Sequence, residues 1–536
     1  MKLNKNLARF RNYIINLIVP ALILGFMTGT LTSIFVLLYK LCAKYVTEFS
    51  EIAYTFLREH LYYIPLILLA FIGLSYLLAY IYKSTPNLKG GGIPTSVGIL
   101  RGIITFKWLR NLIGIFVLSL TTFLIGVPLG NEGPSVQMGT AIGRGSVFTF
   151  AKKHKAWDRY SMTGGACAGF SVATGAPISG IIFAIEEAHQ RISPTIVIVA
   201  SSSVMFANIA SKILCPVFGV SEKMFDIPTL PTLDVWEYWI PLALALVIGL
   251  FSVLFLHYYK LIDKLLIKKL KAIPHQFKIL AILVITLALG LISFSFISTG
   301  HDLVLDLFEN KGTVVMLLII LALRTTVTLG ASSAGITGGT FVPILTLGAV
   351  IASIIGKALI ACGLSSELYT IILVLGITAS IAGSMKMPIT AIIFSLEALS
   401  CYDNLIPVII VAFFSYLVTE IFETKSINDV VMESRIDSEN EGKNQKVIDT
   451  YVTVQKGAFA IGKQIRDIFW PSNLFVLSVK HSKADDAQVD EHGGKAIREG
   501  DVLHVRCSTL DESVMKEELI AIVGAQEIVA SVVDKV

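Results

Sequence analysis

The sequence predicts an all-α protein that crosses the membrane many times, followed by a small α/β domain at its C-terminal end. Three observations support this fold class. Of the 536 residues, 54% are hydrophobic and only 15% are charged, whereas a soluble protein carries about 25% charged residues. Long apolar runs recur between residues 13 and 422, and many of them are interrupted by glycine. Beyond residue 436 the composition becomes polar, and short strand-like runs replace the apolar segments.

The N-terminus predicts the orientation of the first helix. Lys2, Lys5, Arg9 and Arg11 precede the apolar run 13–38, and positive charge of this kind stays on the cytoplasmic side. The run is too long for the core of a signal peptide and lacks a clear small-residue cleavage site. It also exceeds the roughly 20 residues needed to cross a bilayer, so we expect a strongly tilted first helix. The polar C-terminal region lacks export signals, so we expect both termini in the cytoplasm and an even number of crossings.

The remaining apolar runs are uneven in length and often broken. Short, broken segments are tolerated in a bilayer only where they are buried in protein or line a water-filled cavity. The pattern therefore predicts a transporter or channel and not a receptor built from uniform spans. The runs lie at 62–83, 106–127, 157–171, 176–188, 194–215, 236–257, 277–298, 313–331, 341–361, 367–383, 387–400 and 404–422.

Two stretches of the membrane part are repeated. The stretch GAPISGIIFAIE at 175–186 recurs as KMPITAIIFSLE at 386–397, at an offset of 211 residues. Gly130, Pro134 and Gly139 of GNEGPSVQMG at 130–139 recur as Gly339, Pro343 and Gly348 of GTFVPILTLG at 339–348, at an offset of 209. Two matches at nearly one offset predict two related halves, about 12–215 and 230–435. Paired broken segments of this kind point to a substrate site at the repeat interface. The residues alone leave open whether the repeats are inverted.

Glu132 is the most informative charged residue of the membrane part. It lies at a break between two apolar runs, flanked by Gly130, Gly133 and Pro134. Glycine leaves backbone amides uncovered, and proline suits the first turn of a helix. Free N–H groups at a helix N-terminus form a site for an anion. A carboxylate at this point can occupy the anion site itself and leave it when protonated.

Three glycine-proline breaks resemble a known set of motifs. GGGIP at 90–94, GNEGP at 130–134 and GTFVP at 339–343 are similar in order and spacing to the ion-pathway motifs GSGIP, GREGP and GxFxP of the CLC family of anion channels and anion/proton antiporters. The resemblance covers about residues 12–435, within a transmembrane domain expected at 1–435. It implies two inverted repeats with about eighteen helices per subunit, a homodimer with one anion path in each subunit, and a bacterial plasma membrane location.

The resemblance also implies roles for individual residues. Glu132 matches the gating glutamate, which competes with the anion and carries a proton, and Glu187 matches the inner glutamate that passes protons in antiporters. We expect Glu186 and Glu397 to face structural partners, and Lys386 and Arg324 to be charge partners instead of ion ligands. The anion-binding positions implied by the motifs are Gly91, Gly92, Ile93, Gly133, Thr340, Phe341 and Asn428.

Three positions depart from the family pattern. Gly91 stands where most members have a serine, Asn428 stands where a tyrosine closes the inner side of the site, and Asn131 replaces the usual arginine beside the gate. The form GNEGP resembles the fluoride/proton antiporter subclass. We expect an antiporter that exchanges chloride, or halides and nitrate broadly, for protons. A fluoride/proton antiporter and a passive chloride channel are the alternatives.

The C-terminal part predicts a separate domain. Residues 436–448 read as a polar, flexible linker, and 449–536 contain strand-like runs at 451–454, 475–479 and 502–507 and a helix-like run at 511–522. The short motifs GAFAIGK at 457–463 and IFWP at 468–471 resemble the TrkA-C-type (RCK C-terminal) regulatory domain. That resemblance implies dimerisation and, in some members, a small ligand such as a cyclic dinucleotide. A module that only dimerises without a ligand stays open.

Several other functions are disfavoured by the sequence. The net charge is a modest +5 and no basic face is evident, so no nucleic-acid partner is expected. The six cysteines are scattered and are expected to be buried thiols. His481 and His504 are expected at surface or strand positions and not as metal ligands. We find no H-E-x-x-H, P-loop or G-x-S-x-G motif, so the sequence predicts no enzyme, no metal and no cofactor. The expected partners are a small anion, protons and membrane lipid.

Overall fold

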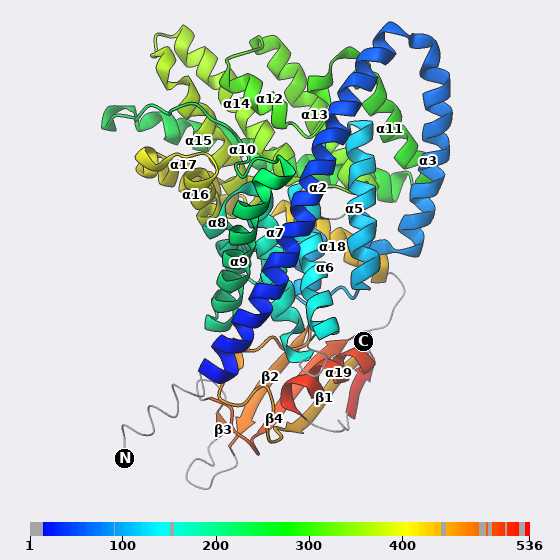
Figure 1. The fold of residues 1–536 in the computed structure, drawn as a ribbon, viewed down its shortest axis with the longest axis vertical. Helices are drawn as coiled ribbons and strands as arrows, with labels where there is room; N and C mark the ends of the chain where they lie inside the picture. Colours follow the sequence, from blue (N-terminus) through cyan, green and yellow to red (C-terminus); the bar gives the residue numbers. More distant parts are fainter. Residues whose placement is uncertain are drawn as a thin grey trace.

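The computed structural model describes residues 14–90, 92–150, 155–440, 446–481, 489–490, 496–509, 512–524 and 531–535. The basic N-terminal residues and Gly91, to which the sequence assigned roles, lie outside this range. The described chain forms a tall helical body with a small sheet at one end (Figure 1). It contains eighteen α-helices, α2 to α19, and the last of these belongs to the sheet region.

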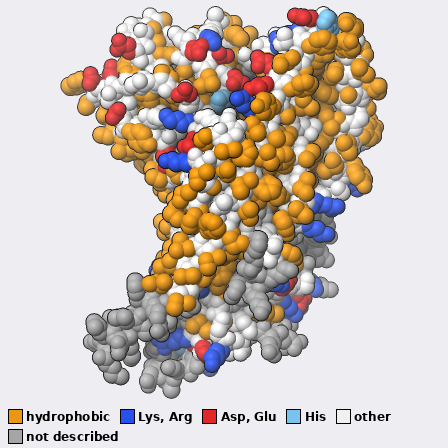
Figure 2. Space-filling model, viewed as in Figure 1, with side chains coloured by type: hydrophobic (Ala, Val, Ile, Leu, Met, Phe, Trp, Pro, Cys, Tyr) orange, Lys and Arg blue, Asp and Glu red, His pale blue; other side chains and the backbone are white. Residues whose placement is uncertain are grey.

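The helical body is a multi-pass membrane structure. Ten of its described helices are long and apolar enough to cross a membrane. Hydrophobic side chains cover the sides of the body, and acidic and basic side chains gather toward its two ends (Figure 2). The first half holds α2 (Val19–Glu59), α3 (Ile64–Ser84), α4 (Ile93–Leu100), α5 (Trp108–Ile125), α6 (Glu132–Phe150), α7 (Asp158–Thr174), α8 (Pro177–Phe183) and α9 (Pro194–Phe218).

The second half has a matching series of elements. It holds α10 (Trp239–Lys264), α11 (His275–Ile292), α12 (His301–Phe308), α13 (Val314–Ala334), α14 (Phe341–Ala361), α15 (Tyr369–Met385), α16 (Pro388–Glu397) and α17 (Leu405–Ile421), and α18 (Ile427–Asn440) follows. Helix α6 runs from the middle of the body toward the sheet, whereas α14 runs from the same level away from it (Figure 1). The equivalent helices of the two halves are therefore inverted.

The first membrane helix is longer than predicted. The apolar run ends at Leu38, but α2 continues to Glu59 over 41 residues. At 1.5 Å per residue it measures about 60 Å, twice the roughly 30 Å of a hydrocarbon core. It crosses the body obliquely (Figure 1), so the predicted strong tilt is present. Lys40, Lys44 and Glu48 do not end the helix, because lysine and glutamate are good helix formers.

Helix α7 is unbroken, although its glycines read as an interruption. A Cβ on Gly165 would lie 2.0 Å from the carbonyl oxygen of Gly139 in α6, and a Cβ on Gly139 would lie equally close to the carbonyl oxygen of Gly165. Small residues allow two helix backbones to approach closely within a membrane. The glycines of α7 therefore serve helix packing, and they bring α6 and the residues at its start into the centre of the body.

The C-terminal region is a five-stranded antiparallel sheet with one helix on it. The strands are β1 (Lys446–Thr453), β2 (Leu474–Lys480), β3 (Val489–Asp490), β4 (Val502–Thr509) and β5 (Ser531–Lys535), in the order β3-β2-β4-β1-β5. Helix α19 (Glu512–Val523) packs on one face, where Leu519 meets Ile448 and Leu503 in a small core. The three predicted strands and the predicted helix are present. The sequence did not predict β3 and β5.

The predicted linker 436–448 overlaps regular structure at both ends. Helix α18 continues to Asn440 and strand β1 begins at Lys446, so a flexible linker over the whole stretch is wrong. Residues 441–445, between these elements, lie outside the described residues. His481, predicted at the surface or in a strand, is buried and its Nδ1 lies 2.8 Å from Asp501 Oδ2. His504 lies in β4 and stacks on Tyr451.

Candidate functional site

The three glycine breaks meet at one point in the centre of the body. The Gly130 amide donates to the Gly339 carbonyl at 2.7 Å, and the Gly339 amide donates to the Gly130 carbonyl at 2.8 Å, so equivalent residues of the two halves form an antiparallel bridge. A Cβ on Gly133 would lie 2.7 Å from the Gly339 Cα, and a Cβ on Gly92 would lie 3.0 Å from the Gly133 Cα. Only glycine allows this contact, which we call the glycine junction.

Three helices begin at the glycine junction. Helices α4, α6 and α14 start at Ile93, Glu132 and Phe341, whereas α18 packs against α4 in the opposite direction and begins near the far end of α4, where Asp429 pairs with Arg101. The first amides of a helix have no partner within the helix and carry partial positive charge. Helix starts gathered at one buried point therefore provide an anion site made of backbone N–H groups.

One predicted anion-binding amide already has a partner. The Gly92 amide donates to Gln137 Oε1 at 2.6 Å, and the Gln137 side chain in turn donates to the Asn87 carbonyl at 2.9 Å and to Asn111 Oδ1 at 3.2 Å. Gln137 thus fixes the start of α4 against α6. We did not single it out from the sequence, although a polar side chain within a membrane helix is a signal of function.

The other predicted anion-binding residues lie at the helix starts around the junction. Ile93 and Phe341 are the first residues of α4 and α14, and Thr340 is the N-terminal cap of α14. Gly133 follows the first residue of α6 and is buried against the Gly339 backbone. Gly91 lies outside the described residues. The structure therefore brings four of the seven predicted positions together at the glycine junction: Ile93, Gly133, Thr340 and Phe341. The amide of a fifth position, Gly92, is hydrogen-bonded to Gln137.

Glu132 is buried at the first position of α6, with 1% of its surface exposed. A Cβ on Gly130 would lie 2.8 Å from Glu132 Oε2, so the carboxylate lies directly against the glycine junction. In the orientation that satisfies both groups, the Asn131 amide nitrogen donates to Glu132 Oε1 at 2.5 Å and to Oε2 at 3.1 Å. A neutral amide stabilises a carboxylate less than a guanidinium does, so Asn131 restrains Glu132 only weakly.

Glu132 also borders a cavity of about 480 Å³ at the end of the body away from the sheet. We call it the distal cavity. Lys40 of α2 and His301 of α12 line it together with Glu132 and Asn131, and Lys40 Nζ donates to the Ser221 carbonyl at 3.1 Å. Both basic residues are in electrostatic range of Glu132. The sequence did not reveal them, because they come from helices far apart in the chain.

Glu187 lies in a π-helical turn, Ala184–Ala188, that follows α8. It is 2% exposed and borders a second cavity of about 470 Å³, which Asp429 and Arg191 also line. We call this the proximal cavity. The Asn428 amide donates to Glu187 Oε1 at 2.9 Å. Asn428, predicted to close the inner side of the anion site, therefore contacts the inner glutamate, because α18 begins one residue earlier.

Arg101 fixes the backbone around Glu187 and does not neutralise its side chain. Its guanidinium donates to the carbonyls of Glu187 and Ala188 at 3.0 and 3.1 Å, and it pairs with Asp429 at 2.9 Å. The carboxyl group of Glu187 accepts its hydrogen bond from the Asn428 amide. Arg101 is the C-terminal cap of α4, so it connects the anion-binding helix to the turn that carries Glu187.

Glu186 and Glu397 cap helices of the opposite half. The Glu186 carboxylate accepts from the amides of Ile389 and Thr390 at 3.0 and 2.7 Å, at the start of α16. The Glu397 carboxylate accepts from Ile178 and Ser179 at 2.9 Å each, at the start of α8. The predicted structural partners are therefore helix N-termini. Carboxylates at such positions stabilise the helix ends through hydrogen bonds and the helix dipole.

Lys386 and Arg324 also have structural partners. Lys386 Nζ lies 2.8 Å from Glu420 Oε1. Arg324 is almost fully buried and donates to three backbone carbonyls, those of Ser295, Ile297 and Ser298. Lys386 lines the proximal cavity together with Glu420, its ion-pair partner, and Arg324 is engaged by backbone carbonyls, so both have the partners that the sequence led us to expect.

The sheet region contacts the body beside the proximal cavity. Phe469, 5% exposed, lies with its ring centre 4.3 Å from that of Tyr160 and 4.4 Å from that of His189. The guanidinium groups of Arg159 and Arg191 lie 5.2 and 4.8 Å from the Phe469 ring centre. Cations over an aromatic face are attracted by the ring quadrupole. The four body residues thus form a basic, aromatic socket for one side chain.

Comparisons with known proteins agree with this architecture. The family model described as voltage gated chloride channel matches residues 68–420. The H(+)/Cl(-) exchange transporter ClcA of Citrobacter koseri is 29% identical over 71% of this chain and 82% of the relative. The transporter of the same name from Klebsiella pneumoniae is 30% identical over 68% of this chain and 78% of the relative.

Two solved structures are similar in fold. A slow cyanobacterial Cl⁻/H⁺ antiporter gives a TM-score of 0.68 at 23% identity and covers 79% of this chain and 98% of its own. A CLC-type fluoride/proton antiporter gives a TM-score of 0.62 at 18% identity and covers 75% of this chain and 96% of its own. The predicted helical membrane fold with inverted halves is confirmed.

Proposed function

The chain belongs to the voltage-gated chloride channel (CLC) family, and on that premise we propose that it exchanges a small anion, most favourably chloride, for protons. One observation carries this proposal above all. Two buried glutamates border different cavities: Glu132, at the glycine junction, borders the distal one, and Glu187, beyond the other end of α4, borders the proximal one. An ionisable group buried within a membrane body is a functional residue by default. A proton carrier toward each side is what an antiporter needs and a passive channel does not.

Competition for one site couples the anion to the proton. Ionised Glu132 places its negative charge at the start of α6, where backbone N–H groups favour an anion. Protonation removes that charge and frees the site, so an anion enters. Return of the carboxylate expels the anion and releases the proton, either into the distal cavity or inward to Glu187. The step needs a side-chain movement only, and no rocking of one half against the other.

Chloride is favoured over fluoride by the relatives at about 30% identity, whose names give chloride as the substrate. The fluoride alternative rests on Asn131, which donates to Glu132 where most members have an arginine. Gly91 adds to the alternative, because it offers the anion no side-chain hydroxyl.

A flux measurement separates these functions. We expect purified protein in liposomes to move protons when a chloride gradient is imposed. A dye inside the liposomes reads the internal pH, and a potassium ionophore is the only electrical shunt. Proton movement driven by fluoride and not by chloride would establish the alternative. Anion flux with no proton movement under either gradient would establish a passive channel. Empty liposomes from the same lipid give the leak to subtract.

The sheet region is proposed to be a TrkA-C-type module on the cytoplasmic side, within a homodimer. The described chain begins at Ile14 at the same end of the body as the sheet (Figure 1), which supports a common side for both ends of the chain. Tyr451 and Phe475 expose 68% and 67% of their surface on the sheet face opposite α19. Exposed aromatic side chains outside the membrane favour contact with a second copy. A small ligand on this module, such as a cyclic dinucleotide, stays a prediction.

We further propose that this module controls the position of Glu187 through Phe469. The contact is directional: Tyr160 Oη donates to the Asp467 carbonyl at 2.8 Å, and Arg159 donates both to the Trp470 carbonyl at 2.5 Å and to the Leu100 carbonyl at 2.8 Å. Leu100 ends α4, and His189, which stacks on Phe469, follows Glu187 by two residues. One side chain of the module therefore lies between the end of the anion-binding helix and the Glu187 turn.

Phe469→Ala tests this role, and Phe475→Ala, which removes an exposed phenylalanine of the same module in β2, is its control. We expect Phe469→Ala to lower the number of protons moved per anion, while anion flux and the folded yield stay near the parent values. Phe475→Ala is expected to leave the proton-to-anion ratio unchanged. An unchanged ratio in Phe469→Ala would limit the contact to holding the module in place.

A further inference from the structure

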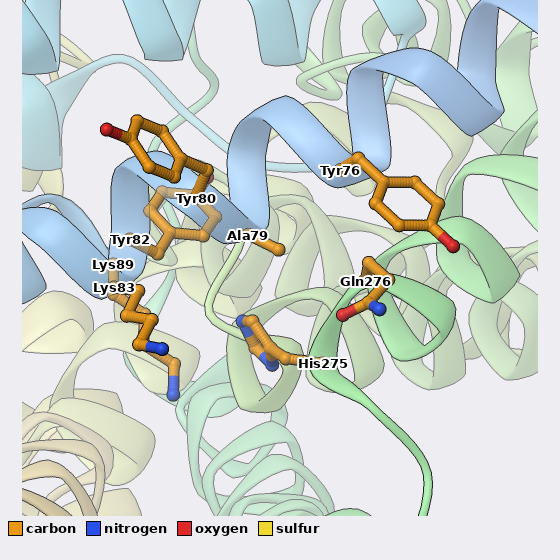
Figure 3. A pocket seen from close by; sticks show the side chains of 8 residues that line it. All are labelled: Tyr76, Ala79, Tyr80, Tyr82, Lys83, Lys89, His275 and Gln276. Carbon is orange, nitrogen blue, oxygen red and sulfur yellow. The ribbon is translucent and has the colours of Figure 1, made fainter.

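A third cavity lies away from the anion path, at the outer edge of the body. It has a volume of about 400 Å³ and sits between the last turns of α3 and the start of α11 (Figure 3). In Figure 3 the two lysine side chains extend together toward the side of the cavity where His275 lies. The residues that line it are Tyr76, Ala79, Tyr80, Tyr82, Lys83, Lys89, His275 and Gln276.

The chemistry of this lining favours an anion. Three of the eight residues are basic and none is acidic. His275 is in electrostatic range of a further lysine, Lys278. The His275 Nε2 atom is buried, and within the described part of the chain it has no hydrogen-bond partner. Buried polar atoms nearly always have a partner, so this nitrogen points to a ligand oxygen. Phosphate, with several strong acceptor oxygens, suits two ammonium groups and an imidazole.

The outer wall of the cavity is a lipid-facing surface. Helix α3 is the least buried of the ten candidate spans, with 11% of its apolar window covered by the rest of the body. Leu69, Tyr76 and Tyr80 expose 65%, 50% and 72% of their surface, and with Lys83 they follow one another at helical spacing. Tyrosine rings at the edge of the bilayer, followed by a lysine that reaches the headgroups, form an interfacial anchor.

We propose that this cavity binds the phosphate of an anionic phospholipid, in the leaflet on the side of the C-terminal sheet. The headgroup phosphate lies between Lys83, Lys89 and His275, and the acyl chains lie along the exposed side of α3. A lipid is favoured over a dissolved phosphate because Tyr76 and Tyr80 at the cavity and Leu69 further along α3 have apolar surface to cover, which a free ion does not do.

Hydrogen bonds link the wall of this cavity to the backbone beside the glycine junction. Tyr82, in its wall, accepts a hydrogen bond at 3.1 Å from the Thr337 amide, and the hydroxyl groups of the two residues lie 3.0 Å apart. Thr337 precedes Gly338, whose amide donates to the Gly90 carbonyl at 2.8 Å. Lys89 is the residue before Gly90. A headgroup that holds Lys89 and Tyr82 in place therefore stabilises the two backbone segments, around Gly90 and Gly338, that lead to the anion site. We expect the bound lipid to raise the transport rate.

The test compares Lys83→Gln with Lys107→Gln, which removes the same charge from an exposed lysine at the start of α5, outside the cavity. Full-length protein is placed in nanodiscs of phosphatidylcholine with rising phosphatidylglycerol, and bound lipid is counted by native mass spectrometry. We expect the parent and Lys107→Gln to retain one phosphatidylglycerol per subunit, and Lys83→Gln to bind it about five-fold more weakly, the typical effect of one lysine near an anionic surface.

Two further measurements make the outcome decisive. Melting curves in phosphatidylcholine alone are expected to be the same for both variants, which separates lost lipid from lost fold. Inorganic phosphate at millimolar concentration is expected to leave the retained lipid in place; displacement by it would overturn the lipid assignment in favour of a dissolved anion. Equal lipid retention in all three proteins would contradict the site. Lipid counting does not depend on anion/proton exchange, so failure of this proposal and of the proposed function are distinguishable.

Discussion

The two halves of the membrane body build the same backbone at the glycine junction and fill it differently. Gly130 and Gly339 bridge each other symmetrically, and at the repeat offset of 209 Glu132 corresponds to Phe341. Glu132 has a neutral amide and a cavity beside it. The Phe341 ring lies 5.3 and 5.4 Å from those of Phe170 and Phe394. At this point the first half carries a side chain with a cavity beside it, and the second half carries a side chain packed between two aromatic rings.

The same asymmetry holds at the second glutamate. At the offset of 211, Glu187 corresponds to Ala398, whereas Glu186 corresponds to Glu397. The pair that both halves keep performs the same helix-capping role in each half. Glu132 and Glu187, which have no acidic counterpart, border the cavities without capping a helix of the other half, whereas Glu186 also lines the proximal cavity but has its carboxylate engaged by the start of α16. Symmetry is therefore kept where it holds the fold together and is lost where a proton has to move, and this distinction can be tested by substitution.

The largest effect is expected from Glu187→Gln. An amide of nearly the same size keeps the hydrogen bond with Asn428 but cannot carry a proton. We expect the proton movement per anion to fall at least about ten-fold, the change that a 1.4 kcal/mol penalty would already give, while chloride flux persists. Paired recordings of internal pH and chloride efflux in liposomes measure the ratio. A ratio like that of the parent would remove Glu187 from the proton path.

Phe341→Leu is the matching test in the second half. Loss of the ring removes two aromatic contacts and leaves a small void, so we expect the free energy of unfolding to fall by about 1–3 kcal/mol. The proton-to-anion ratio is expected to stay at the parent value, because no titratable group is changed. Thermal melting in detergent and the liposome recordings give the two quantities. Loss of coupling without loss of stability would contradict the fixed role of this side chain.

The capping pair provides a test of the retained symmetry. Glu186→Gln and Glu397→Gln each replace a charged acceptor at a helix start by a neutral one, and we expect each to lower the free energy of unfolding by about 1 kcal/mol. The two sites share the backbone hydrogen bonds, and Glu186 also accepts from Thr390 Oγ1 at 2.6 Å, so the loss is expected to be slightly larger for Glu186→Gln. Coupling is expected to remain in both. Melting curves of both variants, measured side by side, decide this. Uncoupled transport in either one would move that glutamate into the proton path.

A smaller effect is expected where the module meets the body. Burial raises the pKa of Glu518 in α19, opposed by Arg159 and Arg144, while Glu517 on the same helix raises it further. A carboxyl group with a raised pKa in the docked state takes up protons on docking. Docking is therefore expected to strengthen as the pH falls toward that pKa and to weaken as the pH rises through it.

Hydrogen exchange of the segment around Phe469, measured from pH 5 to pH 8, follows this equilibrium. The parent is expected to become less protected as the pH rises, and Glu518→Gln is expected to lose most of that dependence, since its amide has no proton to release. Glu517→Gln, which removes the exposed partner of Lys155, is the control and is expected to keep the pH dependence. Equal slopes in all three proteins would assign the pH dependence to another group.

The sequence predicted the parts of the site that depend on the backbone. A glycine that must allow contact and a proline that must start a helix are visible in one chain, so the three breaks and the position of Glu132 could be identified. The repeat indicated two halves, and Glu186 and Glu397 could be assigned structural roles because both halves retain them.

Contacts between distant side chains were beyond a single sequence. Arg101 lies between two apolar runs in the sequence, and nothing there indicates that it holds the Glu187 carbonyl. The roles of Gln137, Lys40 and His301 depend on contacts between elements that are far apart in the sequence. The length of α2 was missed because hydropathy measures contact with lipid, whereas its polar residues between Lys40 and Glu51 border the distal cavity. The socket for Phe469 joins two regions that the sequence presents as separate.

The central claim is that Glu132 is the removable charge at the anion site. Proton and chloride fluxes through purified Glu132→Gln in liposomes test it most directly, because glutamine has the shape of the protonated glutamate and cannot release a proton. We predict that chloride flux persists in this variant and that a chloride gradient moves no protons. Proton movement that survives in Glu132→Gln at the parent ratio would contradict it.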